Sequence, residues 1–181
     1  MVTCQDEQER GMALRADTPS YRLRAATAVD AAFIYDLRVA GLKEYVAQIW
    51  GWDDTVQAAR FQKHFDPVRY HMVMVAGHDV GAVAVEWRDA DVVLADIEIG
   101  PAWRKRGLGT AIITAILAEA RQRELPVVLQ VLNGNPARRL YERLGFRVVE
   151  QTQTHVRMST IDEAPIEVRV RRHGRPAGER A

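Results

Sequence analysis

A basic, glycine-containing stretch near the middle of the chain has the composition of an anion-binding loop. From Arg104 to Thr110 it reads Arg-Lys-Arg-Gly-Leu-Gly-Thr, and it separates a strand-like run from an amphipathic helix pattern. The first turn of a helix leaves N–H groups without partners and carries the positive end of the helix dipole. Gly107 and Gly109 let the backbone approach a phosphate closely, and the basic residues before them add positive charge. We therefore expect a pyrophosphate site here; the alternative is a basic, solvated turn.

Two common nucleotide-binding loops do not fit this stretch. A Walker loop needs Gly-Lys-Ser/Thr four residues after a first glycine, and that pattern is missing. The dinucleotide-binding fingerprint needs three glycines in a strand–helix–strand unit, and here one glycine is lacking.

The elements that must position this loop follow from hydrophobic periodicity. Alternating apolar residues predict strands, and apolar residues three or four positions apart predict helices. The resulting order is strand, helices, a three-stranded meander, helix, strand, helix and two strands. The expected strands are 21–25, 71–76, 80–87, 92–99, 127–131, 146–149 and 155–158. The expected helices start after Thr27, continue through 42–65 with an interruption at Gly51, follow Gly109 as far as Ala120, and cover 137–144 behind an Asn135–Pro136 cap.

Composition limits the class of protein. The chain has 181 residues, a formal net charge of +1 and one cysteine, Cys4. This length fits one domain, for which we expect 21–158, with a flexible leader at 1–20 and a tail at 159–181 in which 166–170 could form a short strand. Met1 and Met12 remain alternative starts. The balanced charge argues against nucleic-acid binding, no apolar run is long enough to span a membrane, and no secretion signal begins the chain, so a cytoplasmic protein is expected.

Two segments together resemble a known superfamily. The stretch from Ile97 to Thr110 resembles the acetyl-CoA motif of the GNAT N-acetyltransferases, whose pattern is Gln/Arg-x-x-Gly-x-Gly/Ala. The stretch from Val131 to Phe146, with Asn-Pro-Ala-Arg-Arg-Leu-Tyr-Glu-Arg-Leu-Gly-Phe at its end, resembles the second signature of that superfamily. The resemblance covers about 21–158 and implies an α+β, three-layer fold. In that fold, a mixed, mostly antiparallel sheet of about seven strands has helices on both faces.

The resemblance also implies where acetyl-CoA binds as co-substrate. Strands four and five of the superfamily part in a V, the pantetheine arm pairs with strand four, and the pyrophosphate rests on the loop amides. No metal is implied. The positions that match are Ile97, Ile99, Arg104, Lys105, Arg106, Gly107, Leu108, Gly109, Thr110, Asn133, Asn135 and Ala137.

The resemblance assigns proton chemistry to a tyrosine and leaves the base open. Tyr141 matches the tyrosine that protonates the leaving thiolate in many relatives, although its helical spacing is also consistent with core packing. Some relatives carry a glutamate base on strand five, where this chain has Gln130. We rank Glu98 first as the general base; Asp96, Glu86, His155 or a relayed water are the alternatives. Asn135 lies six rather than the usual seven residues before the tyrosine, so Asn133 is a second candidate for the contact to the arm.

An aromatic segment falls where the superfamily builds its acceptor pocket. Its Trp-Gly-Trp-Asp stretch is similar to one in a small bacterial branch of the superfamily. Aromatic faces and carboxylates would suit a cationic amine, whereas packing of the helices on the sheet is the alternative. The candidate acceptor residues are Tyr45, Trp50, Trp52 and Asp53.

The leading functional hypothesis is an acetyl-CoA-dependent N-acetyltransferase acting on a primary amine, either small-molecule or peptide. A non-catalytic acyl-CoA-binding or sensor module of the same fold is the alternative, and the missing glutamate on strand five favours it. A homodimer is common in the superfamily, and no nucleic-acid or membrane partner is expected.

Overall fold

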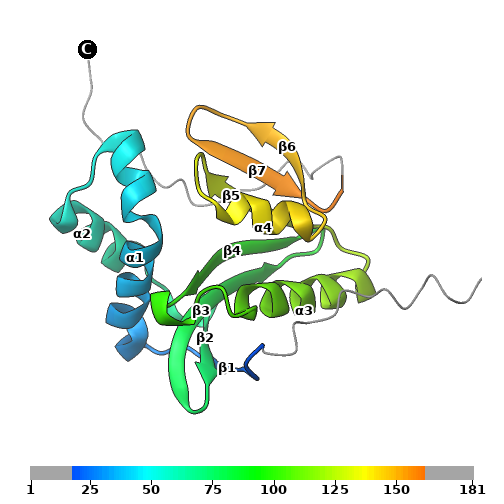
Figure 1. Ribbon diagram of the computed structural model, residues 1–181, viewed down its shortest axis with the longest axis horizontal. Helices are drawn as coiled ribbons and strands as arrows, with labels where there is room; N and C mark the ends of the chain where they lie inside the picture. The colour runs from blue at the N-terminus through cyan, green and yellow to red at the C-terminus, as the bar shows by residue number, and fades with distance from the viewer. Residues whose placement is uncertain (1–17, 162–181) are drawn as a thin grey trace, which may run out of the picture.

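Figure 1 shows the computed structural model of the protein, which describes residues 18–161. The leader residues 1–17, the tail residues 162–181 and the possible strand at 166–170 lie outside the described part. Within 18–161, the chain forms seven strands and four α-helices in the order expected from its hydrophobic pattern.

The bounds of these elements are close to the expected ones. The strands are β1 (Arg22–Ala25), β2 (Tyr70–Val75), β3 (His78–Trp87), β4 (Val92–Ile99), β5 (Val127–Leu132), β6 (Arg147–Gln151) and β7 (His155–Ser159). The α-helices are α1 (Ala31–Trp50), α2 (Asp54–His64), α3 (Leu108–Gln122) and α4 (Ala137–Arg143). Single turns of 3₁₀-helix are η1 (Ala28–Asp30), η2 (Pro67–Arg69) and η3 (Pro101–Trp103).

Local sequence explains where the helices begin and end. Gly51, at φ 79°, ends α1 in a conformation that other residues rarely adopt. The Asp53 carboxylate caps α2 by accepting a hydrogen bond from the N–H of Val56 at 2.9 Å. The Asn135 side chain caps α4 in the same way, because its Oδ1 accepts from the N–H of Ala137 at 2.9 Å.

The seven strands form one sheet in the order β1-β2-β3-β4-β5-β7-β6. Every neighbouring pair is antiparallel except β4 and β5, which run parallel. A parallel pair needs a crossover connection, and α3 supplies it. The expected mixed, mostly antiparallel sheet with helices on both faces is confirmed.

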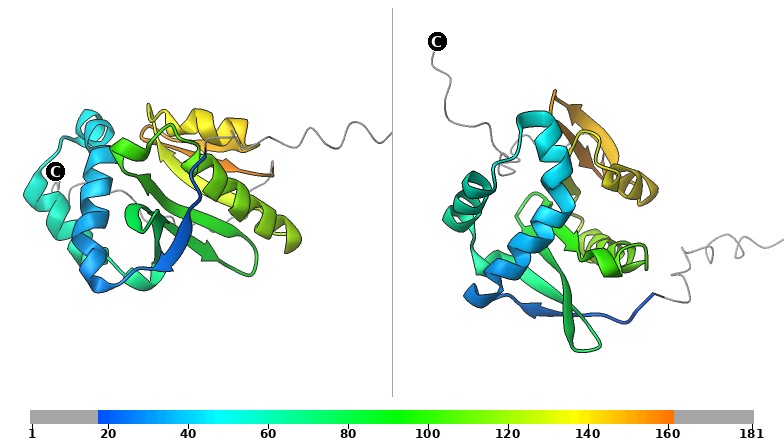
Figure 2. Two further views of the ribbon diagram at one scale, coloured as in Figure 1. Left: turned by 60° about the horizontal axis from the view of Figure 1, so that its bottom comes forward. Right: turned by 60° about the vertical axis from the view of Figure 1, so that its left-hand side comes forward.

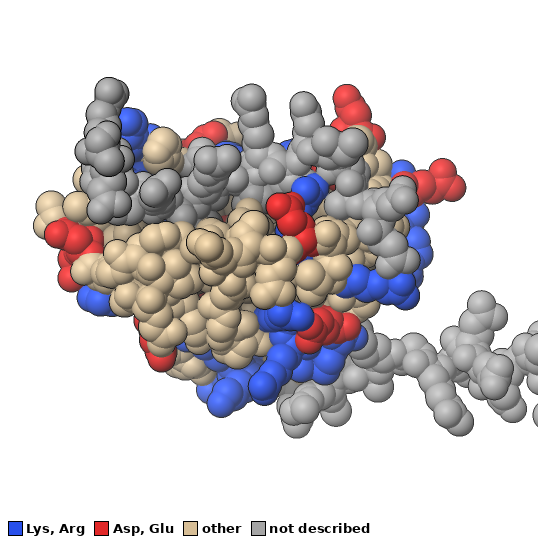
Figure 3. Space-filling view, turned by 90° about the horizontal axis from the view of Figure 1, so that it is seen from above, with Lys and Arg blue, Asp and Glu red and all other residues tan. Residues whose placement is uncertain are grey.

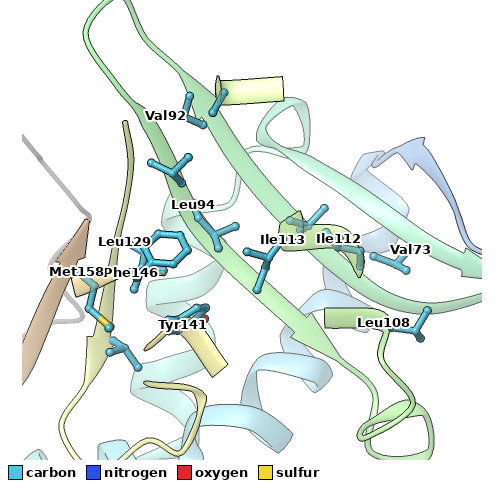
Figure 4. Close-up of a cluster of buried hydrophobic side chains, with 14 of the residues drawn as sticks. Val73, Val92, Leu94, Leu108, Ile112, Ile113, Leu129, Tyr141, Phe146 and Met158 are labelled. Atoms are coloured by element: carbon cyan, nitrogen blue, oxygen red, sulfur yellow. The ribbon is translucent and has the colours of Figure 1, made fainter. Parts of the chain in front are cut away.

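Helices cover both faces of the sheet, so the molecule has three layers (Figure 2). One core cluster joins α3 and α4 to the sheet and contains Ile112, Ile113, Leu129 and Met158; Tyr141 extends from α4 into it (Figure 4). A smaller cluster on the other face joins α1 to β2 and β3 through Ile34, Leu37, Met72 and Ala82. These two clusters pack the helices against the two faces of the sheet. Its middle strands, β4 and β5, form the site.

The parallel pair separates partway along its length. β4 pairs with β5 only from Val92–Val127 to Leu94–Leu129, although β4 continues to Ile99 and β5 to Leu132. At the same point the register of β3 and β4 shifts, which leaves Ala95 as a bulge residue. A bulge bends its strand and increases its twist. The far half of β4 therefore runs away from β5 with one edge unpaired.

Candidate active site

A cavity of about 450 Å³ lies where β4 and β5 diverge. We call it the β4–β5 cavity. Its walls come from α1, both diverging strands, the loop before α3, the first turns of α3, α4 and the start of β7. Most of the expected site residues line it: Tyr45, Ile97, Glu98, Ile99, Arg104, Lys105, Gly107, Leu108, Gly109, Thr110, Asn135, Ala137 and Tyr141. The fold thus brings expected residues from α1, β4, α3, α4 and the loops before α3 and α4 to one cavity, although they are spread over almost 100 positions of sequence.

The loop before α3 presents backbone N–H groups to this cavity. The first hydrogen bond of α3 runs from the N–H of Ala111 to the carbonyl oxygen of Gly107 at 2.9 Å. The N–H groups of 108–110 therefore precede the hydrogen-bond ladder of the helix and carry its positive dipole end. Lys105 and Gly107 both have positive φ, 61° and 85°, which turns the chain sharply at this point. This geometry suits a diphosphate.

The three basic residues of the loop have different surroundings. Arg104 ties the loop to its neighbours: its Nε donates to the carbonyl oxygen of Ile99 at 2.8 Å and its Nη1 to that of Ala40 at 3.4 Å. Lys105 lines the β4–β5 cavity. Arg106, also expected there, lies instead over the ring of Trp103, with its guanidinium carbon 4.9 Å from the ring centroid. Of the three, Arg106 therefore has the least direct relation to the cavity.

Glu98 is a half-buried carboxyl group in the wall of the cavity. Burial raises its pKa to about 8, and the negative charge of Asp96 adds to this, while Arg38 and Arg104 oppose it. A carboxyl group with a pKa near 8 can act as a proton acceptor close to neutral pH. Among the carboxylates considered as the base, Glu98 has the electrostatics that fit that task best.

The Glu98 carboxylate rests against the backbone of α1. A Cβ added at Gly41 would lie 2.2 Å from Glu98 Oε2, so only glycine leaves room for the carboxylate. The carboxylate is the far end of a flexible side chain and can move away. We expect Gly41→Ala to keep or raise the unfolding free energy, since alanine is the better helix former by about 1 kcal/mol. We expect the same variant to lower kcat/KM by about tenfold through displacement of the carboxylate.

A double-mutant cycle tests whether Gly41 acts through Glu98. In the Glu98→Gln background, Gly41→Ala should cause much less further loss, because the carboxylate it displaces is already gone. Steady-state kinetics and thermal unfolding on the four proteins measure both effects. Equal losses in the two backgrounds would show that Gly41 acts independently of Glu98.

Tyr141 is nearly inaccessible to solvent, with 8% of its surface exposed. Its ring packs edge-on against Phe146, with centroids 5.9 Å apart. Burial raises the pKa of the phenol well above its usual value, and the negative charges of Glu98 and Asp96 raise it further. The phenol therefore stays protonated and can only donate a proton. Tyr141 therefore both packs in the hydrophobic core and lines the cavity.

The other candidate bases are each held by neighbours. Asp96 accepts from Arg38 Nη1 at 3.1 Å and from the Tyr70 hydroxyl at 3.3 Å. Glu86 forms ion pairs with two arginines, Arg69 and Arg88. The ring of His155 lines the cavity, and burial lowers its pKa. Its Nδ1 lies 2.7 Å from the Thr154 hydroxyl and its ring 5.7 Å from that of Trp50.

The two asparagines considered for the cofactor arm have separate environments. Asn135 lines the cavity, and its Oδ1 is used in capping α4. Asn133 does not line the cavity; its Nδ2 donates to the carbonyl oxygens of Thr152 and Gln153 at 3.1 and 2.9 Å. Asn133 therefore secures the β6–β7 turn.

A second cavity, of about 260 Å³, lies between α1, α2 and the sheet. We call it the α1–α2 cavity. Trp50 and Trp52 line it, whereas Tyr45 faces the β4–β5 cavity and Asp53 caps α2. The two cavities share Leu42, Ala95 and Asp96 in their walls. A ligand in one cavity can thus approach a ligand in the other where these shared walls lie. The aromatic residues of the Trp50–Trp52 segment predicted an acceptor site there. No local pattern predicted the charged residues that line the same cavity.

The surface carries mixed charges. Figure 3 shows a broad area of uncharged side chains on one face, with basic and acidic side chains around it. Among residues 18–161, no helix combines the length and apolar character needed to cross a bilayer. In the same part of the chain, no three His, Cys, Asp or Glu side chains gather into a group that could hold a metal ion.

Comparison with known proteins finds one matching family model and many solved structures with a similar fold. Residues 32–146 match the model of the acetyltransferase (GNAT) family. The fold is similar to that of the PaiA N-acetyltransferase from Thermoplasma acidophilum in complex with coenzyme A, at 13% identity and TM-score 0.63, over 77% of this chain and 98% of that one. It is also similar to an acetyltransferase from Thermus thermophilus, at 18% identity and TM-score 0.60, over 79% and 97% of the two chains. A third similar structure is that of Ard1 from Thermoplasma volcanium, at 19% identity and TM-score 0.56, over 77% of this chain and 95% of that one. The comparison with curated proteins gives no match.

Proposed function

Because the chain belongs to the acetyltransferase (GNAT) family, we propose that it transfers the acetyl group of acetyl-CoA directly to a primary amine. The observation that carries this proposal is the β4–β5 cavity, which joins the N–H groups at the start of α3 to Glu98 and Tyr141. Acetyl-CoA as co-substrate supplies the thioester. The residues of the chain supply binding, proton transfer and charge stabilisation.

The acceptor amine must lose a proton before it can attack. An alkyl ammonium has a pKa of about 10.4, so only about one molecule in two thousand is the free base at pH 7. With its pKa raised to about 8, Glu98 is a stronger proton acceptor than an ordinary glutamate. An approaching ammonium ion favours the ionised form of the carboxyl group, which places the pair in the state needed for transfer.

The charge that develops on the thioester must also be stabilised. The unpaired edge of β4 offers backbone N–H groups at Glu98 or Ile99 for the carbonyl oxygen, and one such donor lowers the barrier by about 2.7–4 kcal/mol. Negative charge develops on the departing sulfur, and the Tyr141 phenol, which burial keeps protonated, lies in the cavity wall; in this proposal it donates its hydrogen bond and proton to that sulfur.

Thiol release in the presence of amines tests this proposal. Purified protein, acetyl-CoA and a panel of primary amines should give amine-dependent thiol release, with an equal amount of acetylated amine by mass spectrometry. Binding of acetyl-CoA in calorimetry without amine-stimulated thiol release would contradict a transferase and favour the acyl-CoA sensor.

A glycine variant tests the role of the loop before α3. Gly107 has φ 85°, and a Cβ there would lie 2.4 Å from Thr18 Oγ1. We expect Gly107→Ala to raise the Kd for acetyl-CoA about tenfold or more in titration calorimetry, because the left-handed conformation costs about 1–2 kcal/mol and the amides lose their alignment.

Gly77 provides a matched control for backbone strain alone. It lies in the β2–β3 turn at φ 81°, and no atom lies within 4 Å of an added Cβ. Gly77→Ala should lower stability by a similar amount and leave the Kd for acetyl-CoA unchanged. If both variants changed the Kd equally, the loop would have no special part in binding.

A further inference from the structure

Arg38 of α1 lies beside two carboxylates of β4. Asp96 and Glu98 are two residues apart on that strand, so their side chains lie on the same face of the sheet, and both line the β4–β5 cavity. Arg38 comes three residues before Gly41, so the two share one side of the helix. The Glu98 carboxylate rests at Gly41, whereas Arg38 Nη1 donates to Asp96 Oδ2 at 3.1 Å. The guanidinium therefore pairs with Asp96, although a second carboxylate lies close by.

A tyrosine from β2 fixes the same carboxylate oxygen. Tyr70 is opposite Ala84 of β3, and Ala84 is in turn opposite Asp96 of β4. Residues that lie opposite each other across neighbouring strands point to one face of the sheet, and the small side chain of Ala84 leaves room for the phenol to extend over it. The Tyr70 hydroxyl donates to Asp96 Oδ2 at 3.3 Å. Asp96, with 14% of its side chain exposed, is thus held from both α1 and β2.

The choice that Arg38 makes between the two carboxylates has a chemical consequence. A guanidinium paired with Glu98 would stabilise its ionised form and make it a poor proton acceptor. Paired with Asp96, the guanidinium has its charge offset, and the negative charge of Asp96 stays near Glu98. The raised pKa of Glu98 agrees with this arrangement: burial is its largest cause, and Asp96 raises the pKa more than Arg38 lowers it.

Other ionisable groups around Glu98 come from the remaining walls of the cavity. Arg104, in the loop before α3, also lowers the pKa of Glu98. On the neighbouring strand β3, the residue opposite Glu98 is the uncharged Ala82. All of these groups stay in place when only Asp96 or Arg38 is substituted. The further ionisable side chains that line the cavity are Tyr45, Lys105, Tyr141, Arg143 and His155.

We propose that Asp96 is a positioning residue for Glu98: it holds the Arg38 guanidinium away from the Glu98 carboxylate and so keeps that carboxylate able to take a proton from the acceptor amine. This inference rests on the proposed acetyl transfer with Glu98 as its base. It gives Asp96 a part in the reaction without contact to the reacting atoms. The two acidic residues of β4 are then not interchangeable, because one accepts the proton and the other occupies the arginine.

The titration of Glu98, followed by NMR, tests this inference. In protein labelled with ¹³C in its glutamate side chains, the Glu98 carboxyl resonance is the one missing from Glu98→Gln. In Asp96→Asn, the pKa of Glu98 should fall from about 8 to about 7 or below, because a negative charge is lost and Arg38 is released. In Arg38→Gln, the pKa should rise instead. The inflection in the pH profile of kcat/KM should move with it in both variants.

Three further variants separate charge from packing. Arg38→Lys keeps the positive charge, so the pKa of Glu98 should stay near its wild-type value. The double variant Asp96→Asn/Arg38→Gln removes both charges and should give a pKa between those of the two single variants. Glu119→Gln removes a carboxylate that also pairs with an arginine, Arg123, but neither residue lines the β4–β5 cavity. It should leave the pKa of Glu98 and the pH profile unchanged.

The outcomes separate this inference from the proposed function, because the NMR titration requires no turnover. An unchanged pKa of Glu98 in Asp96→Asn, or a change in the same direction in both single variants, would overturn the positioning role and leave acetyl transfer intact. If Asp96→Asn failed to fold, a pKa in Arg38→Gln that did not exceed the wild-type value would overturn it equally. Opposite changes in the two variants, without amine-dependent thiol release by the wild type, would overturn acetyl transfer and with it the part of Asp96 in the reaction.

Discussion

Tyr141→Phe is expected to lower kcat by about 100-fold or more and to leave the Kd for acetyl-CoA nearly unchanged. The variant keeps the ring that packs against Phe146 and removes only the hydroxyl. Because burial and the nearby carboxylates keep this phenol protonated, its loss removes the proton donor for the leaving thiolate without emptying the core. Steady-state kinetics and titration calorimetry measure the two quantities.

Tyr21 offers a matched control. It also packs against the main core cluster, and burial raises the pKa of its phenol, but it is not among the residues that line the β4–β5 cavity. Tyr21→Phe should leave kcat within about twofold of the wild type, because the residue lies outside the site. An unchanged kcat in Tyr141→Phe would remove Tyr141 from the mechanism.

Glu98→Gln is expected to lower kcat/KM by about 100-fold or more and to change its pH dependence. In the wild type, kcat/KM should rise as the pH increases through about 8, where the Glu98 carboxyl group ionises. The amide cannot ionise, so the variant should lose the inflection at about pH 8 and keep only the continuous rise toward the pKa of the acceptor ammonium, about 10.4. A pH series of kcat/KM for both proteins makes the comparison.

In the wild type, ionisation of Glu98 should lower the unfolding free energy while it raises kcat/KM. The folded-state pKa of Glu98, about 8, lies above the value of about 4.5 expected in the unfolded chain. The unfolded state therefore releases its proton first, and the unfolding free energy falls as the pH rises from about 5 to 8. Glu98→Gln should show a shallower fall over this interval in denaturant titrations.

His155 is the alternative that this experiment separates from Glu98. Burial lowers the pKa of its ring below 6.5, so a base at His155 would produce a rise at lower pH. If the inflection near pH 8 remained in Glu98→Gln, the base would lie elsewhere. A rise below pH 6.5 that disappeared in His155→Gln would assign the role to His155.

Most of the fold could be predicted from local patterns. The strand-like runs at 80–87 and 92–99 correspond to β3 and β4, and the apolar stripe of 112–120 to α3. These signals are local, because the two faces of a strand or helix differ in burial wherever the chain packs on a sheet. The loop from Arg104 to Thr110 could also be predicted from the local sequence, because glycine and basic residues before a helix favour the binding of an anion.

Contacts between distant residues could not be predicted in this way. Nothing in the sequence near Gly41 indicates that it makes room for the Glu98 carboxylate, because the two residues lie on different elements. The aromatic segment indicated Trp50 and Trp52, but their separation from Tyr45 into another cavity depends on how α1 crosses the sheet. The sequence predicts Asn133 as a second candidate for the contact to the cofactor arm, but nothing near it indicates that its Nδ2 donates to the carbonyl oxygens of the β6–β7 turn.

A crystal structure of the protein with acetyl-CoA tests the central claim most directly. We expect the pantetheine arm between the diverging halves of β4 and β5, the pyrophosphate on the N–H groups of residues 105–110, and the thioester beside Glu98 and Tyr141. Electron density for acetyl-CoA at any other place on the molecule, with the β4–β5 cavity occupied only by solvent, would contradict the account.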